Sequence, residues 1–199
     1  MSAKNTTLLW MLLLLLTNRL SAQSYNTMWV PDTLSGTNFN LALKNTFAQL
    51  VTGNQTITSA VNQSRFWGPT LIMTKGTTVH LNVTNYLNDT TTLHWHGMHL
   101  PAVMDGGPFQ TIPPGTVWRP CWTVRNQAAT LWYHPHLHKM TQAQVTKGVG
   151  GFIIIRDTAE AALLLPRKYG VDDFVLALSS RRFLSSNQLT ATLAGNYRD

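Results

Sequence analysis

Apolar residues recur at every second position over much of the chain, which is the spacing of a half-buried β-strand and not of a helix. The pattern is clearest over residues 78–84, where Val79, Leu81 and Val83 alternate with polar residues. The same pattern predicts further short strands at residues 39–43, 70–74, 92–96, 117–124, 130–134 and 151–156. Residues 152–155 are apolar on both faces, as expected for a strand inside a packed sandwich.

Turn-forming residues separate these strands, as at Gly68-Pro69, Asp105-Gly106-Gly107-Pro108 and Pro113-Pro114-Gly115. We expect no amphipathic helix of any length between them. Many short strands joined by turns are typical of an all-β protein, either an antiparallel sandwich or a barrel. A parallel α/β fold is disfavoured, because it would need helical segments between the strands.

Residues 1–22 have the layout of a secretory signal peptide, in which Lys4 precedes an apolar run at residues 8–16 and small residues follow. The run is about half the ~20 residues that a membrane-spanning helix requires. We therefore expect a mature chain that begins near Gln23, without a stable membrane anchor. The expected location is exported, either periplasmic or secreted, and a signal of this length without a disulfide pair suits a bacterial periplasm best.

Residues 23–157 contain all the strands predicted above and match the ~100–150 residues of an ordinary domain. After Asp157 a short apolar stretch leads through Pro166 and Gly170 into a strand-like run at residues 174–178. We interpret residues 158–199 as a linker and the first strand or strands of an incomplete second domain. They are too few to bury a core of their own.

Composition adds few constraints to this picture. With 44% apolar and 12% charged residues the chain is globular in type. The net charge of +7 comes from fifteen scattered Lys and Arg residues, and without a basic stripe a nucleic-acid partner is disfavoured. Cys121 is the only cysteine, which rules out an internal disulfide, and we expect it to be a buried small residue.

Six of the seven histidines form two clusters, HWHGMH at residues 94–99 and WYHPHLH at residues 132–138. Side chains alternate between the faces of a strand, so a His-x-His pair presents two imidazoles on one side. Two such pairs at the ends of neighbouring strands could converge on one or more metal ions, because imidazole binds copper, zinc, iron and nickel. Gly97 permits a sharp exit after the first pair, and Pro135 fits a strand end.

Five motifs follow one another along this part of the chain: HWHG (94–97), MDGGP (104–108), IPPG (112–115), WYHPH (132–136) and GVGGFIIIRD (148–157). In this order and spacing they resemble the N-terminal cupredoxin domain of the multicopper oxidases, the family of laccases, bilirubin oxidases and periplasmic cuprous oxidases. The resemblance extends from Gly68 to Asp157, and more weakly into residues 165–174. It implies a cupredoxin-like Greek-key β-sandwich followed by the start of a second cupredoxin domain.

The resemblance also implies a share of a trinuclear copper cluster. His94 would bind the type 2 copper, and His96, His134 and His136 would bind the type 3 pair. Asp105 resembles the family's acid that helps to deliver protons as dioxygen is reduced, although a turn-forming role before Gly-Gly explains it equally well.

The remaining candidate ligands are interpreted differently. His138 is expected to form a hydrogen bond behind a ligand, while His80 and His99 are expected to be solvent-facing or structural. Met98, Met104 and Met140 are interpreted as core residues and not as thioether ligands of Cu(I).

In this family a copper-dependent oxidoreductase couples oxidation of a reducing substrate to the four-electron reduction of dioxygen to water. The complete cluster also needs histidines from motifs near the C-terminus, and the type 1 copper needs a Cys flanked by His. This sequence has neither, since Cys121 lies in Arg-Pro-Cys-Trp. We therefore expect the isolated chain to bind copper without turnover and to require C-terminal domains or another chain. A phenol-like substrate and cuprous ion remain equally open.

Three alternatives stay open from the sequence. The chain could be a non-catalytic copper-binding cupredoxin module or a truncated gene product that needs another chain for activity. A zinc hydrolase or hydratase also uses a His-x-His pair with a third histidine. Some family members have lost their metals and serve structural or cell-division roles, which the four matching histidines disfavour here.

Overall fold

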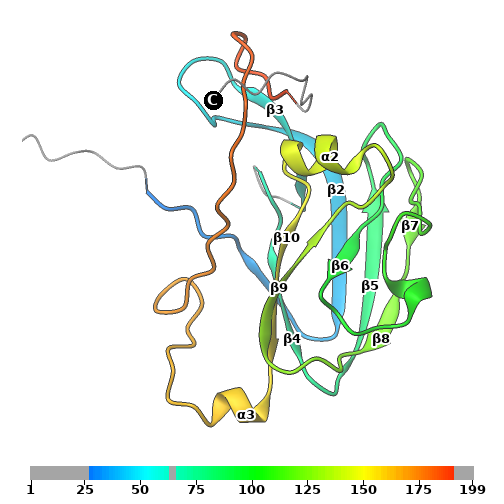
Figure 1. Cartoon of the computed structure of the whole chain (residues 1–199), viewed down its shortest axis with the longest axis vertical. Coiled ribbons are helices and arrows are strands. Elements are labelled where there is room, and N and C mark those ends of the chain that lie inside the picture. The colour runs from blue at the N-terminus through cyan, green and yellow to red at the C-terminus, as the bar shows by residue number, and fades with distance from the viewer. Residues whose placement is uncertain (1–26, 63–65, 191–199) are drawn as a thin grey trace, which may run out of the picture.

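The computed structural model describes residues 27–62 and 66–190, so the predicted signal peptide lies outside the described residues. Two sheets pack face to face (Figure 1). The first contains, in spatial order, β1 (Thr33–Ser35), β4 (Thr70–Thr74), β10 (Gly151–Arg156), β9 (Ala129–His134) and β6 (His94–His96). The second contains β3 (Thr56–Val61), β2 (Asn38–Ala48), β5 (Thr78–Asn85) and β7 (Val117–Trp118), with β8 (Cys121–Thr123) also paired to β5.

The architecture confirms an all-β, cupredoxin-like sandwich, but its sheets are mixed. Strand β4 is parallel to both β1 and β10, and β2 is parallel to β5. The sandwich expected from the strand pattern is therefore present, but three of its strand pairs are parallel where the expectation was antiparallel. Parallel neighbours need a crossover connection. Here the chain forms at least one strand of the other sheet between the two parallel partners.

Most predicted strands are present, with shifted ends. The predictions at residues 70–74 and 151–156 coincide with β4 and β10. The strand predicted at residues 117–124 is two strands, because the chain leaves the ladder at Arg119-Pro120, and proline has no N–H to donate. Strands β1 and β3 were not predicted, since β1 has only three residues and β3 is rich in buried threonine and serine.

In the part of the chain that the structure describes, helical elements are few and short. They are the 3-10 helix η1 (Ala102–Met104) and the α-helices α2 (Thr141–Lys147) and α3 (Thr158–Ala161). Helix α2 was not predicted, because its seven residues are too few to show a clear amphipathic period. It ends at Gly148, whose φ of 110° is the left-handed conformation that commonly terminates helices.

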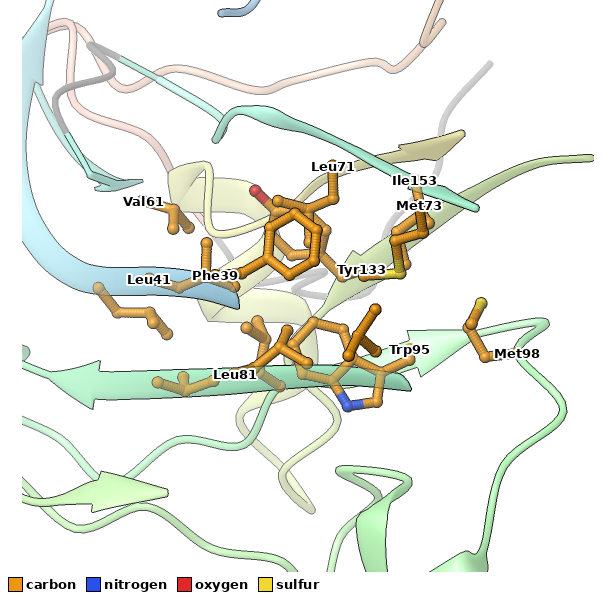
Figure 2. Close-up of a cluster of buried hydrophobic side chains, with 14 of the residues drawn as sticks. Phe39, Leu41, Val61, Leu71, Met73, Leu81, Trp95, Met98, Tyr133 and Ile153 are labelled. Carbon is orange, nitrogen blue, oxygen red and sulfur yellow. The ribbon is translucent and has the colours of Figure 1, made fainter. Parts of the chain in front are cut away.

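The core lies between the two sheets and is built from the alternating apolar positions that the sequence displays. Val79, Leu81 and Val83 point inward from β5, while the residues between them face outward or lie at the boundary. Figure 2 shows Tyr133 gathered with Phe39 and Leu71, and Trp95 lying beside Leu81. Burying such side chains is the main favourable contribution to folding.

Two large side chains of this core belong to the histidine clusters. Trp95 and Tyr133 are fully buried, and their ring centroids are 6.1 Å apart. The Trp95 indole N–H donates to the carbonyl of Met104 at 3.1 Å, and the Tyr133 hydroxyl donates to the carbonyl of Pro69 at 2.8 Å. The aromatic residue next to each histidine therefore holds that part of the strand to the core.

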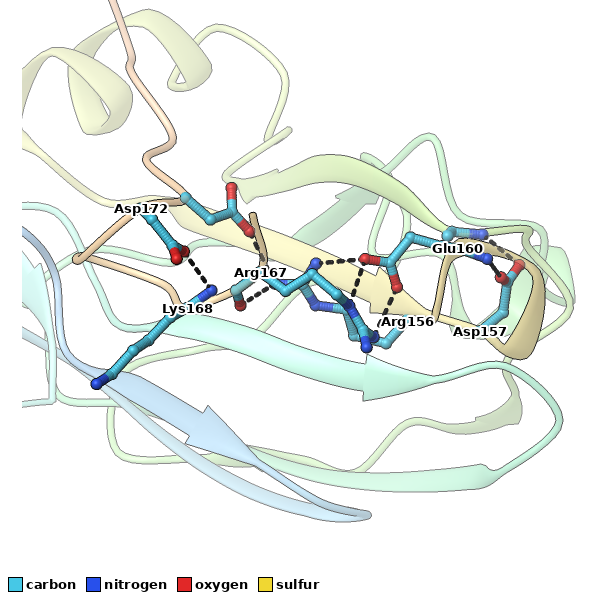
Figure 3. A network of polar contacts seen from close by, with 8 residues as sticks. Arg156, Asp157, Glu160, Arg167, Lys168 and Asp172 are labelled. Atoms are coloured by element: carbon cyan, nitrogen blue, oxygen red, sulfur yellow. Dashed lines mark hydrogen bonds and ion pairs between the residues drawn. The ribbon is translucent and has the colours of Figure 1, made fainter. Parts of the chain in front are cut away.

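A polar network attaches the segment after β10 to the sandwich (Figure 3). Arg156 forms ion pairs with Glu160 at 3.0 Å and Asp173 at 2.8 Å, and Arg167 pairs with Glu160 at 2.8 Å. Asp157 caps α3 by accepting a hydrogen bond from the Glu160 N–H at 2.7 Å. The sandwich strands therefore end at Arg156, and the chain that follows is fixed to their end.

Residues 174–178 do not form the strand that the sequence predicts. Leu176 and Leu178 are strongly exposed, and the run is paired with no strand among the described residues. An apolar run without a neighbouring strand has no ladder to join. Further on, the Thr56 hydroxyl donates to the Asn187 carbonyl at 2.8 Å and the Ile57 N–H donates to Gln188 at 2.9 Å, so this part of the chain covers β3.

The sequence-based expectation of a buried Cys121 is wrong. Cys121 is exposed and not buried, because β8 points Trp122 inward and its two flanking residues outward. Among the described residues, no helix combines the length and the apolar character needed to span a membrane.

We predict that Tyr133→Phe lowers the free energy of unfolding by about 1–3 kcal/mol, because the buried carbonyl of Pro69 would lose its donor. Urea denaturation followed by tryptophan fluorescence measures the change. Tyr86→Phe is the matched control, since Tyr86 is exposed, and we expect a change within about 0.5 kcal/mol. Equal effects of the two substitutions would contradict the role given to the Tyr133 hydroxyl.

Candidate metal centre

The two histidine clusters meet where β6 pairs with β9. The strands are antiparallel, with His94 opposite His134, Trp95 opposite Tyr133 and His96 opposite Trp132. Because side chains alternate along a strand, Trp95 and Tyr133 enter the core while His94, His96 and His134 lie on the other face. The pairing therefore brings together imidazoles that are about forty positions apart in the chain, as the sequence predicts.

Three imidazoles form a compact group. One ring nitrogen from each of His94, His96 and His134 lies within 4.8 Å of the others. Two nitrogens bound to one ion lie about 3–4 Å apart, since each bond to the metal is about 2 Å long. The spacing is therefore close to that of ligands on one ion or on neighbouring ions.

His136 adjoins this group without entering its tightest part. Its ring centroid lies 5.3 Å from that of His94 and 5.9 Å from that of His134. It follows β9 after Pro135, beyond the end of the ladder, and its side chain is exposed. Its backbone N–H donates to the hydroxyl of the buried Thr92 at 2.7 Å. All four histidines that the sequence singles out thus lie together.

Hydrogen bonds orient two of the rings. Nδ1 of His94 lies 2.9 Å from the Asp105 carbonyl and 3.2 Å from the Asp105 carboxylate, and Nδ1 of His134 lies 2.7 Å from the Pro135 carbonyl. A nitrogen that faces acceptors carries the proton, so the lone pair of each ring is on Nε2. Both rings therefore have Nε2 available for a metal.

The third ring, that of His96, points Nδ1 at the group, whereas His94 and His134 present Nε2. Nδ1 of His96 lies 3.1 Å from Nε2 of His134. In the metal-free chain a proton on one of the two nitrogens makes this a hydrogen bond. A cation placed beside both nitrogens would replace that proton.

The surroundings of His134 keep its imidazole neutral. Its pKa is lowered to about 4, chiefly by burial and in addition by the nearby His94, His96 and His136, while the hydrogen bond to the Pro135 carbonyl opposes the shift. Trp132 stacks on the ring with centroids 3.9 Å apart. A neutral imidazole is the form that binds metals, so this ring is a ready ligand near neutral pH.

The contacts of Asp105 are compatible with both of the roles that the sequence left open. Its backbone ends η1, and its carbonyl accepts from the Trp95 N–H at 3.3 Å, as expected of a turn residue. Its half-buried carboxylate also contacts His94 at 3.2 Å. A carboxylate that accepts from a ligand imidazole fixes the ring and raises its basicity.

Two glycines allow the chain to reach this arrangement. Gly97 has a φ of 86° and turns the chain immediately after His96, as predicted. Gly106 has a φ of 71°, and a Cβ there would overlap the backbone of Leu93, next to His94. Only glycine permits both the left-handed conformation and this close approach.

The other histidines do not belong to the centre. His80, His99 and His138 are exposed, and none of them belongs to the compact group. Met98 is buried in the core and Met104 packs against it, as expected of core residues. The sequence did not reveal the contacts of Thr92 and Trp132, since one lies in a run of three threonines and the other resembles any strand aromatic.

The donor set suits a transition metal. It consists of four imidazoles with one carboxylate behind them and no thiolate, since the sole cysteine, Cys121, is on β8 in the other sheet. Imidazole nitrogen suits copper, zinc, iron and nickel, and copper(II) binds such sites most tightly of the divalent first-row metals. The residues present therefore fit copper.

Comparison with known proteins decides the family. The family model described as multicopper oxidase matches residues 43–160, which is more than half of the chain. The chain belongs to the multicopper oxidase family. A multicopper oxidase of Staphylococcus aureus is 39% identical over 118 residues, covering 59% of this chain and 26% of the relative. The cell division protein FtsP of Escherichia coli is 35% identical over 118 residues, with 59% and 25% covered.

Solved multicopper oxidases share the fold. A crystal structure from Pediococcus acidilactici matches with a TM-score of 0.78 at 31% identity, over 84% of this chain and 37% of that one. The McoA multicopper oxidase of Aquifex aeolicus matches with a TM-score of 0.77 at 29% identity, over 84% and 38%. The chain therefore spans about a quarter of the length of the curated relatives it matches.

We predict that Gly106→Ala lowers the free energy of unfolding by about 2 kcal/mol or more, from left-handed strain and overlap with Leu93. The neighbouring Gly107→Ala is the matched control: it would meet only ordinary contacts and should change stability by about 0.5 kcal/mol at most. Thermal and urea unfolding of the two variants measure the difference. Equal stability would show that the approach of Gly106 to β6 is not constrained.

Proposed function

We propose that this chain supplies the N-terminal share of a trinuclear copper cluster in a multicopper oxidase. In this proposal His94 binds the type 2 copper, while His96, His134 and His136 bind the type 3 pair. The observation that carries the proposal is the convergence of these four imidazoles at the β6–β9 edge, with His94 opposite His134. Membership of the family supports copper as the metal.

The bound copper ions would supply the redox chemistry, passing electrons to dioxygen until water is formed. The chain's own residues prepare the site for them. His94 and His134 present Nε2 because their Nδ1 atoms face carbonyl oxygens, and His96 presents Nδ1. The rigid pairing of β6 with β9 fixes the directions from which three of the ligands approach.

Asp105 is proposed to relay protons from water to this site. Its carboxylate is partly open to solvent and contacts Nδ1 of His94, so it can exchange a proton with water while it remains beside a ligand. Reduction of dioxygen to water consumes protons, and a carboxylate at the edge of the cluster is well placed to relay them.

The complete protein is proposed to oxidise a phenol-like substrate or cuprous ion and to reduce dioxygen by four electrons. The remaining histidines and the type 1 copper would come from C-terminal domains or from another chain. Residues 23–157 would be the first cupredoxin domain and residues 158–199 the linker and start of the second. A signal peptide at residues 1–22 would direct the protein to the periplasm or the exterior.

A second candidate is a structural role without turnover, because proteins named as cell division protein FtsP are among the relatives. The four converging imidazoles favour a metal-binding chain over this alternative. Metal analysis of the purified chain separates the two roles. A metal-free preparation that takes up no copper would favour the structural role, and resident zinc would favour the hydrolase alternative.

We predict that the chain binds Cu(II) and that His96→Ala weakens the binding by more than the roughly 10–100-fold cost of losing an outer-shell partner. Isothermal titration and electron paramagnetic resonance measure affinity and ligation. His80→Ala is the matched control, because His80 is also exposed on a strand but lies outside the group, and it should bind copper like the unaltered chain. Absent copper binding, or equal binding by both variants, would contradict the proposed site.

We predict that Asp105→Asn weakens Cu(II) binding by roughly 10-fold, because a neutral amide no longer raises the basicity of His94. The turn should survive, since the Asp105 carbonyl and backbone are unchanged, and circular dichroism checks this. In the full-length oxidase the same change should lower the rate of dioxygen consumption and alter its pH profile. An unchanged affinity and pH profile would leave Asp105 only its turn-forming role.

A further inference from the structure

Strand pairing alone does not fix the fourth imidazole. Strand β6 ends at His96 and β9 ends at His134, so His136 lies outside the ladder. Its side chain is exposed, and it is separated from the strand by Pro135, which has no N–H to donate. A separate contact must therefore hold His136 at its distance from His94, which is 5.3 Å between ring centroids.

Thr92 provides that contact. It is fully buried two residues before His94, and its hydroxyl oxygen accepts the backbone N–H of His136 at 2.7 Å. This hydrogen bond joins the segment that leads into the first histidine pair to the backbone of the second pair. It acts on the main chain of His136, so the imidazole remains available to bind a metal.

Gln144 provides a second contact between the same two segments. It lies on α2, eight residues after His136, and only 5% of it is exposed. Its amide N–H donates to the Thr90 carbonyl at 2.9 Å, and its amide oxygen accepts the Thr91 hydroxyl at 2.9 Å. The opposite orientation of the amide would place two carbonyl oxygens against each other, so the assignment is fixed by the network.

The burial of these groups distinguishes them from ordinary surface contacts. A buried amide costs free energy unless its hydrogen bonds are made. An apolar side chain at the same position of α2 would carry no such cost. Thr91 is itself held by paired backbone bonds with Ile112, at 2.8 and 3.1 Å. The polar groups therefore tie α2 to a fixed point beside β6, where they set a distance that apolar packing would leave adjustable.

We propose that Thr92 and Gln144 form a positioning clamp that sets the separation of the two histidine pairs, and so determines how His136 joins a metal held by the others. The inference rests on the proposed copper site. Thr92 acts directly on the backbone of His136, and Gln144 acts through α2 on the segment that connects to it. Neither side chain is a ligand.

Thr92→Val tests the clamp, since valine keeps the shape of threonine and removes the acceptor, while Thr92→Ser keeps the acceptor. We expect Thr92→Val to weaken Cu(II) binding by roughly 10-fold and to alter the copper hyperfine pattern, and Thr92→Ser to restore both. Gln144→Met should act in the same direction. Gln142→Met, an exposed position on the same helix, is the matched control and should leave binding unchanged.

A metal-free measurement separates positioning from general stability. In the metal-free chain, Thr92→Val should speed exchange of the His136 amide hydrogen at least 10-fold, with little change at core amides of β5. Copper binding and spectra that are identical in Thr92→Val and Thr92→Ser would overturn the clamp alone. Failure of the unaltered chain to bind copper would overturn the proposed function and the clamp with it.

Discussion

The antiparallel pairing of β6 with β9 carries the candidate site. Its register places His94 opposite His134, and the alternation of side chains then decides the position of everything else nearby. A shift by one residue would turn Trp95 and Tyr133 out of the core and the imidazoles into it. That exchange would bury several polar rings and expose two of the largest apolar side chains. The register is therefore fixed by the core, and the metal-binding face is a consequence of it.

The aromatic neighbours of the histidines give this register its stability. Trp95 and Tyr133 are both fully buried, and each also makes a hydrogen bond through its polar atom. On the opposite face Trp132 stacks against His134 and shields it from water. Apolar packing below the strands and stacking above them hold the imidazoles in place without any metal. A site prepared in this way loses little conformational freedom when an ion binds.

The structure also separates the parts of the site by how firmly they are held. His94, His96 and His134 belong to the ladder, whereas His136 depends on contacts from a loop and a short helix. Asp105 reaches His94 from a turn whose close approach requires Gly106. The chain's share of the site thus consists of a rigid inner group and an outer part supported by buried polar side chains. The outer part is where small structural changes would act first.

The local patterns in the sequence were sufficient for most of the strands, for the all-β class and for the two His-x-His pairs. Period-two alternation depends only on neighbouring residues, and His-x-His on a strand fixes the relation of two rings within each pair. Other features depend on chain segments that are distant in sequence. The mixed sheets, the exposure of Cys121 and the absence of a strand at residues 174–178 follow from which segments lie side by side. The contacts of Thr92, Gln144 and Trp132 have the same origin, because a buried hydrogen bond or a stacked ring requires a partner that no local pattern identifies.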